Sequence, residues 1–250
     1  MDRGAARVKA WIGAGRETCQ NLPMTYRRYA LYYTPAEAGW SHWATRWLGW
    51  DMTQGAPVAP PEGLDIDPHG WTATPRRYGL HATLKPPFRL AQGEGFAQLT
   101  EAFQHYCDTT PPVEIGTPAL TRLGRFLALM PAPQPAALTD AAAGIVRAFD
   151  PFRAPASEDE LARRRAAGLS PDQEANLTRW GYPYVMEGFR FHITLTEKLS
   201  RQDIEKAKEI LTTHLLPLLP EALTLDALSL AGEDDMGRFH LIERRRLAGQ

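Results

Sequence analysis

Apolar and polar residues alternate along several short stretches of this chain, and a period of two is typical of a β-strand with one buried face. Residues 26–33, which read YRRYALYY, are the first such stretch and are rich in aromatic residues. The stretch ALTRLGRFLALM further along also reads as one strand. The pattern predicts strands over 26–33, 78–85, 113–115, 120–130, 189–196, 223–230 and 238–243, with Pro86 and Pro87 ending the second of them.

Helix start and stop signals account for much of the remaining chain. Three segments begin with a serine that can cap a helix and have an acidic or amide residue three positions later. These serines are Ser157, Ser170 and Ser200. Gly181 and Pro183 should end the second of these helices, because neither residue continues a helix well. The signals predict helices over about 34–48, 95–106, 136–149, 157–165, 170–180 and 200–215.

The order of these elements indicates the fold class. Strands and helices are mixed without a regular β-α-β alternation, which favours an α+β fold with antiparallel sheet. We predict a single domain over residues 24–250, with a helical insertion at about 136–181. The first 23 residues lack the apolar segment of a signal peptide, and strand-like alternation begins directly after Met24. We expect residues 1–23 to be a disordered leader or the result of a mis-assigned start.

Composition narrows the classes of function. The chain has 250 residues, of which 44% are hydrophobic and 23% charged, as in ordinary soluble proteins. Its net charge of −1 gives no indication of nucleic acid or an anionic membrane as partner. No apolar run approaches the roughly 20 residues of a membrane-spanning helix. Cys19 and Cys107 cannot form a disulfide framework, so we expect a cytoplasmic protein.

One short phrase occurs twice, more than a hundred residues apart. The first copy lies in YGLHATLKPPF and contains His81, and the second lies in FRFHITLT and contains His192. Both read His, any residue, Thr, Leu. Because side chains alternate between the faces of a strand, each copy predicts an apolar buried face and a polar face. The polar faces carry His81, Thr83 and Lys85 in the first copy, and Arg190, His192, Thr194 and Thr196 in the second.

A face with an imidazole, a hydroxyl and a fixed positive charge suits a phosphate group. Two such faces opposed across a cleft would place one imidazole on each side of a phosphorus atom. One histidine could then remove a proton from the attacking oxygen while the other protonates the departing oxygen. The phrases lack the HExxH, DxD and CxxC spacings of metal sites, so we expect neither metal nor cofactor.

The paired phrases resemble the motifs of the two-histidine phosphoesterase superfamily. The stretches RYALYYTP, FLALMP, FDPFRAP, LARRRAAGLSPDQ and WGYPYV extend this similarity to the branch found in phosphonate-utilisation operons, over about residues 28–199. The resemblance implies a bilobal, pseudo-twofold α+β fold whose antiparallel sheets line a central cleft, with helices outside. It implies His81 and His192 as the acid–base pair and Thr83 and Thr194 as phosphate-binding hydroxyls.

The operon context of that branch implies a small substrate, ribose 1,2-cyclic phosphate 5-phosphate, hydrolysed without metal. Further side chains, within the two copies and beyond them, could hold its second phosphate and its sugar. The candidates for these contacts are Lys85, Arg125, Arg153, Tyr182, Tyr184 and Arg190. Arginines 163 and 164 lie in the same insertion, where they could equally form an exposed helix face.

Other functions remain open from the sequence. The enzyme could act on RNA ends that carry a 2′,3′-cyclic phosphate, as in the 2′-5′ RNA ligase-like branch, although the net charge does not favour nucleic acid. The same cleft could belong to a phosphate-ligand binding protein without catalysis, or the histidines could bind a metal. We expect a monomer with a small-molecule substrate and no membrane partner.

Overall fold

A computed structural model describes residues 26–249 of the chain. The predicted leader over residues 1–23 lies outside the described residues, as does Cys19. In the part that is described, no helix is both long and apolar enough to cross a membrane.

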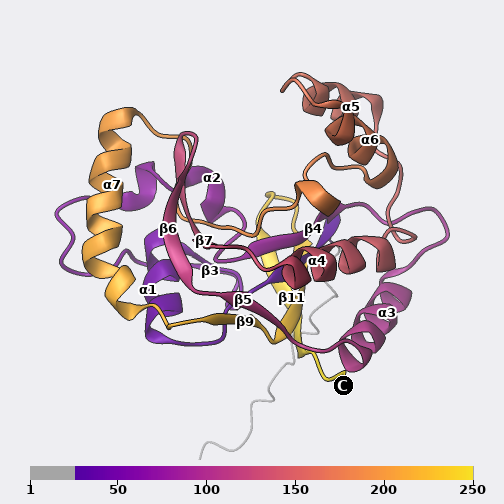
Figure 1. Cartoon of the computed structure of the whole chain (residues 1–250), viewed down its shortest axis with the longest axis horizontal. Coiled ribbons are helices and arrows are strands. Elements are labelled where there is room, and N and C mark those ends of the chain that lie inside the picture. Colours follow the sequence, from indigo (N-terminus) through magenta and orange to yellow (C-terminus); the bar gives the residue numbers. More distant parts are fainter. Residues whose placement is uncertain (1–25, 250) are drawn as a thin grey trace, which may run out of the picture.

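An antiparallel sheet of seven strands forms the centre of the protein (Figure 1). Its strand order is β11-β10-β1-β4-β8-β7-β6. Two further pairs of short strands, β2 with β3 and β5 with β9, lie outside this sheet. The strands are β1 (Arg28–Tyr33), β2 (Trp50–Asp51), β3 (Ala56–Pro57), β4 (Ala82–Phe88), β5 (Val113–Gly116), β6 (Pro118–Leu123), β7 (Phe126–Pro131), β8 (Ile193–Thr194), β9 (Leu223–Leu225), β10 (Ala227–Glu233) and β11 (Phe239–Arg246).

The helices begin largely where the capping signals indicate. Ser157, Ser170 and Ser200 each accept a hydrogen bond from a backbone N–H in the first turn of α5, α6 and α7. Gly181 ends α6 in the left-handed conformation, with φ of 72°. The helices are α1 (Gly39–Leu48), α2 (Ala73–Arg76), α3 (Phe96–Thr109), α4 (Ala136–Ala148), α5 (Glu158–Arg165), α6 (Pro171–Trp180) and α7 (Arg201–His214), with 3₁₀ turns at Pro68–Gly70, Met186–Gly188 and Leu216–Leu218.

The core lies between one face of the sheet and the long helices. Leu84 of β4 and Ile193 of β8 are almost fully buried, as the two-faced strand pattern predicts. Both belong to a cluster that includes buried residues of α1, α3, α4 and α7. The opposite face of the two central strands is therefore left for polar side chains.

The predicted α+β class with antiparallel strands and helices outside is confirmed. Ala82 of β4 pairs with Ile193 of β8. This contact joins the two halves of the sheet, the first made of β11, β10, β1 and β4 and the second of β8, β7 and β6. Helices α3 and α4 pack against the first half and α7 against the second (Figure 1). The two motif strands thus lie beside each other at the centre of one continuous sheet, and residues of both halves line a cavity over its polar face.

Several element boundaries differ from the sequence prediction, and three of the differences have a clear physical reason. The alternation predicts one strand over 120–130, but β6 and β7 form a hairpin, because Gly124 turns the chain with φ of 58°. Strand β4 continues through Pro86 and Pro87, where irregular pairing with β1 requires fewer N–H donors. Helix α1 starts at Gly39, after the predicted capping residue Thr34, whose hydroxyl instead contacts Ser229 at 2.7 Å.

Candidate active site

The sheet register brings the two sequence phrases together. Because Ala82 pairs with Ile193 in antiparallel fashion, the next residues along the chain place His81 opposite Thr194 and Thr83 opposite His192. Residues that are directly opposite each other project from the same face of a sheet. Four side chains from distant parts of the sequence therefore form a rectangle, with the two histidines on one diagonal.

Both imidazoles are oriented by the same local hydrogen bond. His81 Nδ1 lies 2.9 Å from the carbonyl oxygen of Gly79, and His192 Nδ1 lies 2.7 Å from that of Arg190. A carbonyl can only accept, so each Nδ1 carries the proton and each neutral ring has its lone pair on Nε2. The Thr83 hydroxyl lies 3.2 Å from His81 Nε2 and donates to it. Each histidine thus has its basic nitrogen at Nε2, and that of His81 accepts from Thr83.

A cavity of about 700 Å³ opens over this face. His81, Thr83 and Thr194 line it. The half-buried His192 stands beside it, with its ring centroid 6.2 Å from that of Phe126, which is a lining residue. The remaining lining residues are Arg28, Tyr32, Thr74, Pro75, Tyr78, Pro86, Pro87, Arg164, Tyr182, Thr196, Glu197 and Lys198.

His81 has an aromatic environment. Its ring centroid lies 4.1 Å from that of Tyr32 and 5.7 Å from that of Tyr78. Burial lowers the pKa of His81 from 6.5 to about 4; the Gly79 carbonyl partly opposes this shift, and nearby His192 adds to it. Near neutral pH, His81 is therefore uncharged and able to accept a proton.

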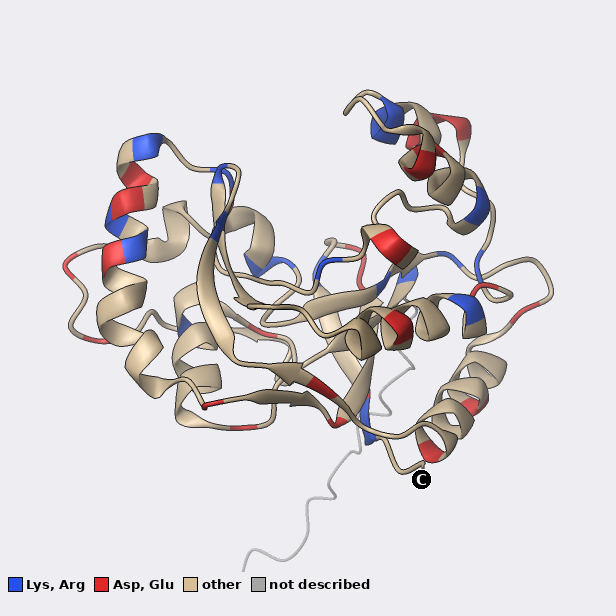
Figure 2. Cartoon of the chain, in the orientation of Figure 1, with Lys and Arg blue, Asp and Glu red and all other residues tan. Residues whose placement is uncertain are grey.

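The charged groups of the cavity are mostly cationic. Arg28, Arg164 and Lys198 line it together with a single acidic residue, Glu197. Elsewhere, charges of both signs are mixed along α7 and along the arm formed by α5 and α6 (Figure 2). The cavity thus differs in its charge from the chain as a whole, whose net charge is −1.

Of the predicted substrate contacts, Tyr182 lines the cavity but Lys85 does not. Thr83 pairs with Tyr32 whereas Lys85 pairs with Leu31, so β4 contains an extra residue at this point. Such a bulge reverses the alternation of faces. The Lys85 side chain is only 2% exposed, and its Nζ lies 3.3 Å from Asp150, behind the strand. Burial lowers the pKa of Lys85 to about 8, against the opposing effect of Asp150.

The other predicted contacts also lie elsewhere. Arg125 is in the β6–β7 turn and donates to the carbonyl of Leu199. Arg153 donates to Asp150 and to the carbonyl of Arg179 at the end of α6. The side chains of Tyr184 and Arg190 are exposed and outside the lining of the cavity, although the Arg190 carbonyl orients His192.

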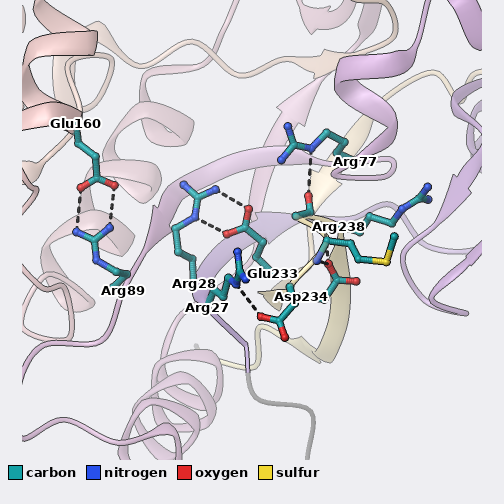
Figure 3. Close-up of polar contacts among 11 residues, drawn as sticks. Arg27, Arg28, Arg77, Arg89, Glu160, Glu233, Asp234 and Arg238 are labelled. Carbon is teal, nitrogen blue, oxygen red and sulfur yellow. Dashed lines mark hydrogen bonds and ion pairs between the residues drawn. The ribbon is translucent and has the colours of Figure 1, made fainter.

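Sequence reasoning missed several lining residues. Arg28 and Tyr32 lie on β1, and the even-numbered positions of that strand share one face. The sequence shows that these two residues share a face of β1. It does not show that this face lies beside His81, because that depends on the pairing of Tyr32 with Thr83. Arg28 is held by two hydrogen bonds to Glu233 on the neighbouring strand β10, one of them 2.6 Å long (Figure 3).

With this geometry, the chain can be compared with known proteins. The chain belongs to the family described as "Protein of unknown function (DUF1045)", which matches residues 83–240. The sequence motifs predicted that the chain belongs to a known protein family, and this match confirms that prediction.

Two curated relatives carry the name "Ribose 1,5-bisphosphate phosphokinase PhnN". The relative from Janthinobacterium sp. (strain Marseille) is 38% identical over 220 residues, which is 84% of this chain and 48% of the relative. The relative from Laribacter hongkongensis (strain HLHK9) is 36% identical over 183 residues, which is 71% of this chain and 42% of the relative. The chain thus spans about half the length of the curated relatives it matches.

Two solved structures are remotely similar. One, described as "Crystal structure of phosphoesterase", is 14% identical with a TM-score of 0.41 and covers 90% of this chain and 100% of its own. The other, a protein of Thermus thermophilus, is 12% identical with a TM-score of 0.39 and covers 89% and 99%. Likenesses this remote carry no conclusion about activity.

Proposed function

We propose that this protein is a metal-independent cyclic phosphodiesterase that opens the cyclic phosphate of a small phosphorylated sugar by histidine acid–base catalysis. The observation that carries the proposal is the arrangement of the two phrases. His81 and His192 occupy one diagonal of a four-residue rectangle, and each donates from Nδ1 to a carbonyl, which leaves Nε2 as the basic nitrogen. Cα atoms on such a diagonal are roughly 7–8 Å apart, which leaves room for one phosphoryl group between the two rings.

The reaction in this site is a hydrolysis in one displacement. One imidazole takes a proton from water as the water oxygen bonds to phosphorus. The ring phosphorus–oxygen bond breaks on the opposite side, and the second, protonated imidazole gives its proton to the departing sugar oxygen. His81 suits the role of base because its lowered pKa keeps it neutral, which leaves His192 as the acid. Thr194 lines the cavity and would donate to a non-bridging oxygen, and Thr83 would do the same when its hydroxyl turns from His81 Nε2 to the substrate.

The names of the curated relatives support a phosphorylated ribose as substrate. Those proteins are named for ribose 1,5-bisphosphate, and this chain matches about half of their length. Breaking the bond between phosphorus and O2 in ribose 1,2-cyclic phosphate 5-phosphate gives ribose 1,5-bisphosphate. We therefore propose that the reaction supplies that compound. We propose no kinase activity, because the sequence lacks the GxxxxGK[ST] loop of P-loop kinases.

Phosphorus NMR provides the test. The protein is incubated in EDTA with ribose 1,2-cyclic phosphate 5-phosphate and, separately, with a 2′,3′-cyclic nucleotide. The expected result is conversion of the cyclic ester of ribose to a monoester, with little conversion of the nucleotide. Faster opening of the nucleotide would support the RNA-end alternative. Binding of both compounds without conversion would support a non-catalytic binding protein, and loss of activity in EDTA would contradict the proposed mechanism.

A further inference from the structure

The cavity above the histidines continues into a small recess that is rich in arginine. Arg28, Pro87 and Arg164 line both the cavity and the recess. Arg89 and Arg153 complete the cationic lining of the recess. Four guanidinium groups therefore gather beside one end of the proposed catalytic site.

Three of these arginines have carboxylate partners. Arg28 pairs with Glu233, Arg89 with Glu160 at 2.9 Å (Figure 3), and Arg153 with Asp150 at 2.8 Å. Arg164 forms no ion pair with any residue in the range 26–249. Its guanidinium carbon instead lies 4.7 Å from the ring centroid of Tyr182, in a cation–π contact. Arg164 thus faces the cavity with no carboxylate bonded to it; Glu160, whose charge acts on Arg164 from the same face of the helix, is already held by Arg89.

The orientation of α5 brings Arg164 to the cavity, whereas its neighbours Arg163 and Arg165 are not among the lining residues. Glu160 and Arg164 are four residues apart on α5, so they share one face of the helix. Arg89 donates to both carboxylate oxygens of Glu160, and these two hydrogen bonds hold this face of α5 toward the sheet. Arg163 and Arg165, on the other side of the helix, are exposed.

A buried hydroxyl points to a ligand in the same place. Tyr32 is fully buried, lines the cavity, and has no hydrogen-bond partner for its hydroxyl among the described residues. Arg28 and its carboxylate partner Glu233 are close enough to influence that hydroxyl electrostatically, as are Tyr78 and Tyr182. Buried hydroxyls without partners are rare because they lose their bonds to water. An oxygen of a bound ligand would supply the missing acceptor.

From these contacts we propose a second anion subsite formed by Arg164, Arg28 and the Tyr32 hydroxyl, which binds a phosphate remote from the reacting one. The inference rests on the proposed function and specifies its substrate as a doubly phosphorylated sugar. Tyr32 pairs with Thr83 and so marks the end of the subsite nearer the histidines, and Arg28 lies four residues before it on β1, about 13 Å away at the usual rise per residue. That spacing leaves room for a sugar between the reacting phosphate and the remote one, because the side chains of Arg28 and Arg164 extend to the cavity.

The experiment compares two substrates that differ only in the remote group. The value of kcat/KM is measured for ribose 1,2-cyclic phosphate with and without the 5-phosphate, using wild type, Arg164→Gln and Tyr32→Phe. Wild type should prefer the 5-phosphorylated compound, and Arg164→Gln should reduce that preference by roughly 10- to 100-fold, as expected for loss of a charged hydrogen bond. Tyr32→Phe should reduce it by a smaller factor. Arg163→Gln, an exposed neighbour on the same helix, is the matched control and should keep the wild-type preference.

The outcomes separate this inference from the proposed function. If wild type opens both compounds equally well, or if Arg164→Gln slows both by the same factor, the subsite is refuted while the phosphodiesterase stands. If neither compound is opened, the function fails, and calorimetry with ribose 5-phosphate still tests the subsite. Wild type and Arg163→Gln should then bind it at least about tenfold more tightly than Arg164→Gln; equal binding would overturn the proposal. Circular dichroism confirms that each variant is folded.

Discussion

The two copies of the histidine phrase share their local geometry and differ in their surroundings. In both, Nδ1 donates to the carbonyl two residues earlier in the chain. His81, however, packs against Tyr32 and Tyr78, whereas the ring near His192 is that of Phe126 at 6.2 Å. The shared phrase sets which ring nitrogen carries the proton. The surroundings of His81 bury its ring, and this burial lowers the pKa of that histidine.

The copies also diverge four residues after each histidine. Lys85 turns behind the sheet to Asp150 because of the bulge in β4. Thr196, the equivalent residue of the second copy, accepts from the N–H of Leu127 and donates to the carbonyl of Glu197. Both residues are buried, yet one holds an ion pair and the other stabilises the end of a strand. Sequence equivalence therefore extends through His-x-Thr-Leu and ends there.

The largest expected effect tests the part that the copies share. His81→Gln and His192→Gln should each lower kcat by roughly 10²–10⁴-fold, because each removes one proton-transfer group. The double variant should be little worse than either single one, since the groups act as a unit. Steady-state kinetics with the cyclic ester measures this. His105→Gln, at an exposed position of α3, is the control and should match wild type; activity retained by either site variant would refute the paired role.

A smaller effect tests the difference between the copies. The pKa of His81 is lowered to about 4 in the folded protein, whereas an unfolded histidine titrates near 6.5. Between these values the unfolded chain binds the extra proton first, so the stability of the fold should fall as pH decreases from 6.5 toward 4. Urea unfolding across this range should show a steeper loss for wild type than for His81→Gln. Parallel slopes would mean that the aromatic contacts do not control the charge of His81.

The smallest effect on activity is expected at Lys85. Lys85→Met should keep kcat/KM close to wild type, because the side chain lies behind the sheet and Asp150 retains Arg153 as its partner. Replacement of a buried ion pair by an apolar side chain of similar size is often neutral or stabilising. Kinetics and thermal unfolding of this variant measure both quantities. A loss of activity comparable with that of the histidine variants would show that Lys85 acts on the substrate.

Much of the fold is readable from the sequence because its signals are local. The serines that cap α5, α6 and α7 act within one turn of their helices. The alternation around His81 and His192 depends only on strand geometry, and it predicted the buried faces of both copies and the shared polar face of the histidines and threonines, but it was wrong for Lys85. The pairing of two similar phrases was enough to select the four residues of the rectangle.

The rest depends on contacts between segments that are distant in the chain. The bulge that turns Lys85 away arises from the pairing of β4 with β1, and no residue within the phrase indicates it. The sequence determined which histidines and threonines share a strand face. Only the tertiary structure decided that Arg164, and neither of its arginine neighbours, would join them, because the orientation of α5 is set by the bond between Glu160 and Arg89. That bond joins residues far apart in the chain, and local patterns carry no information about such contacts.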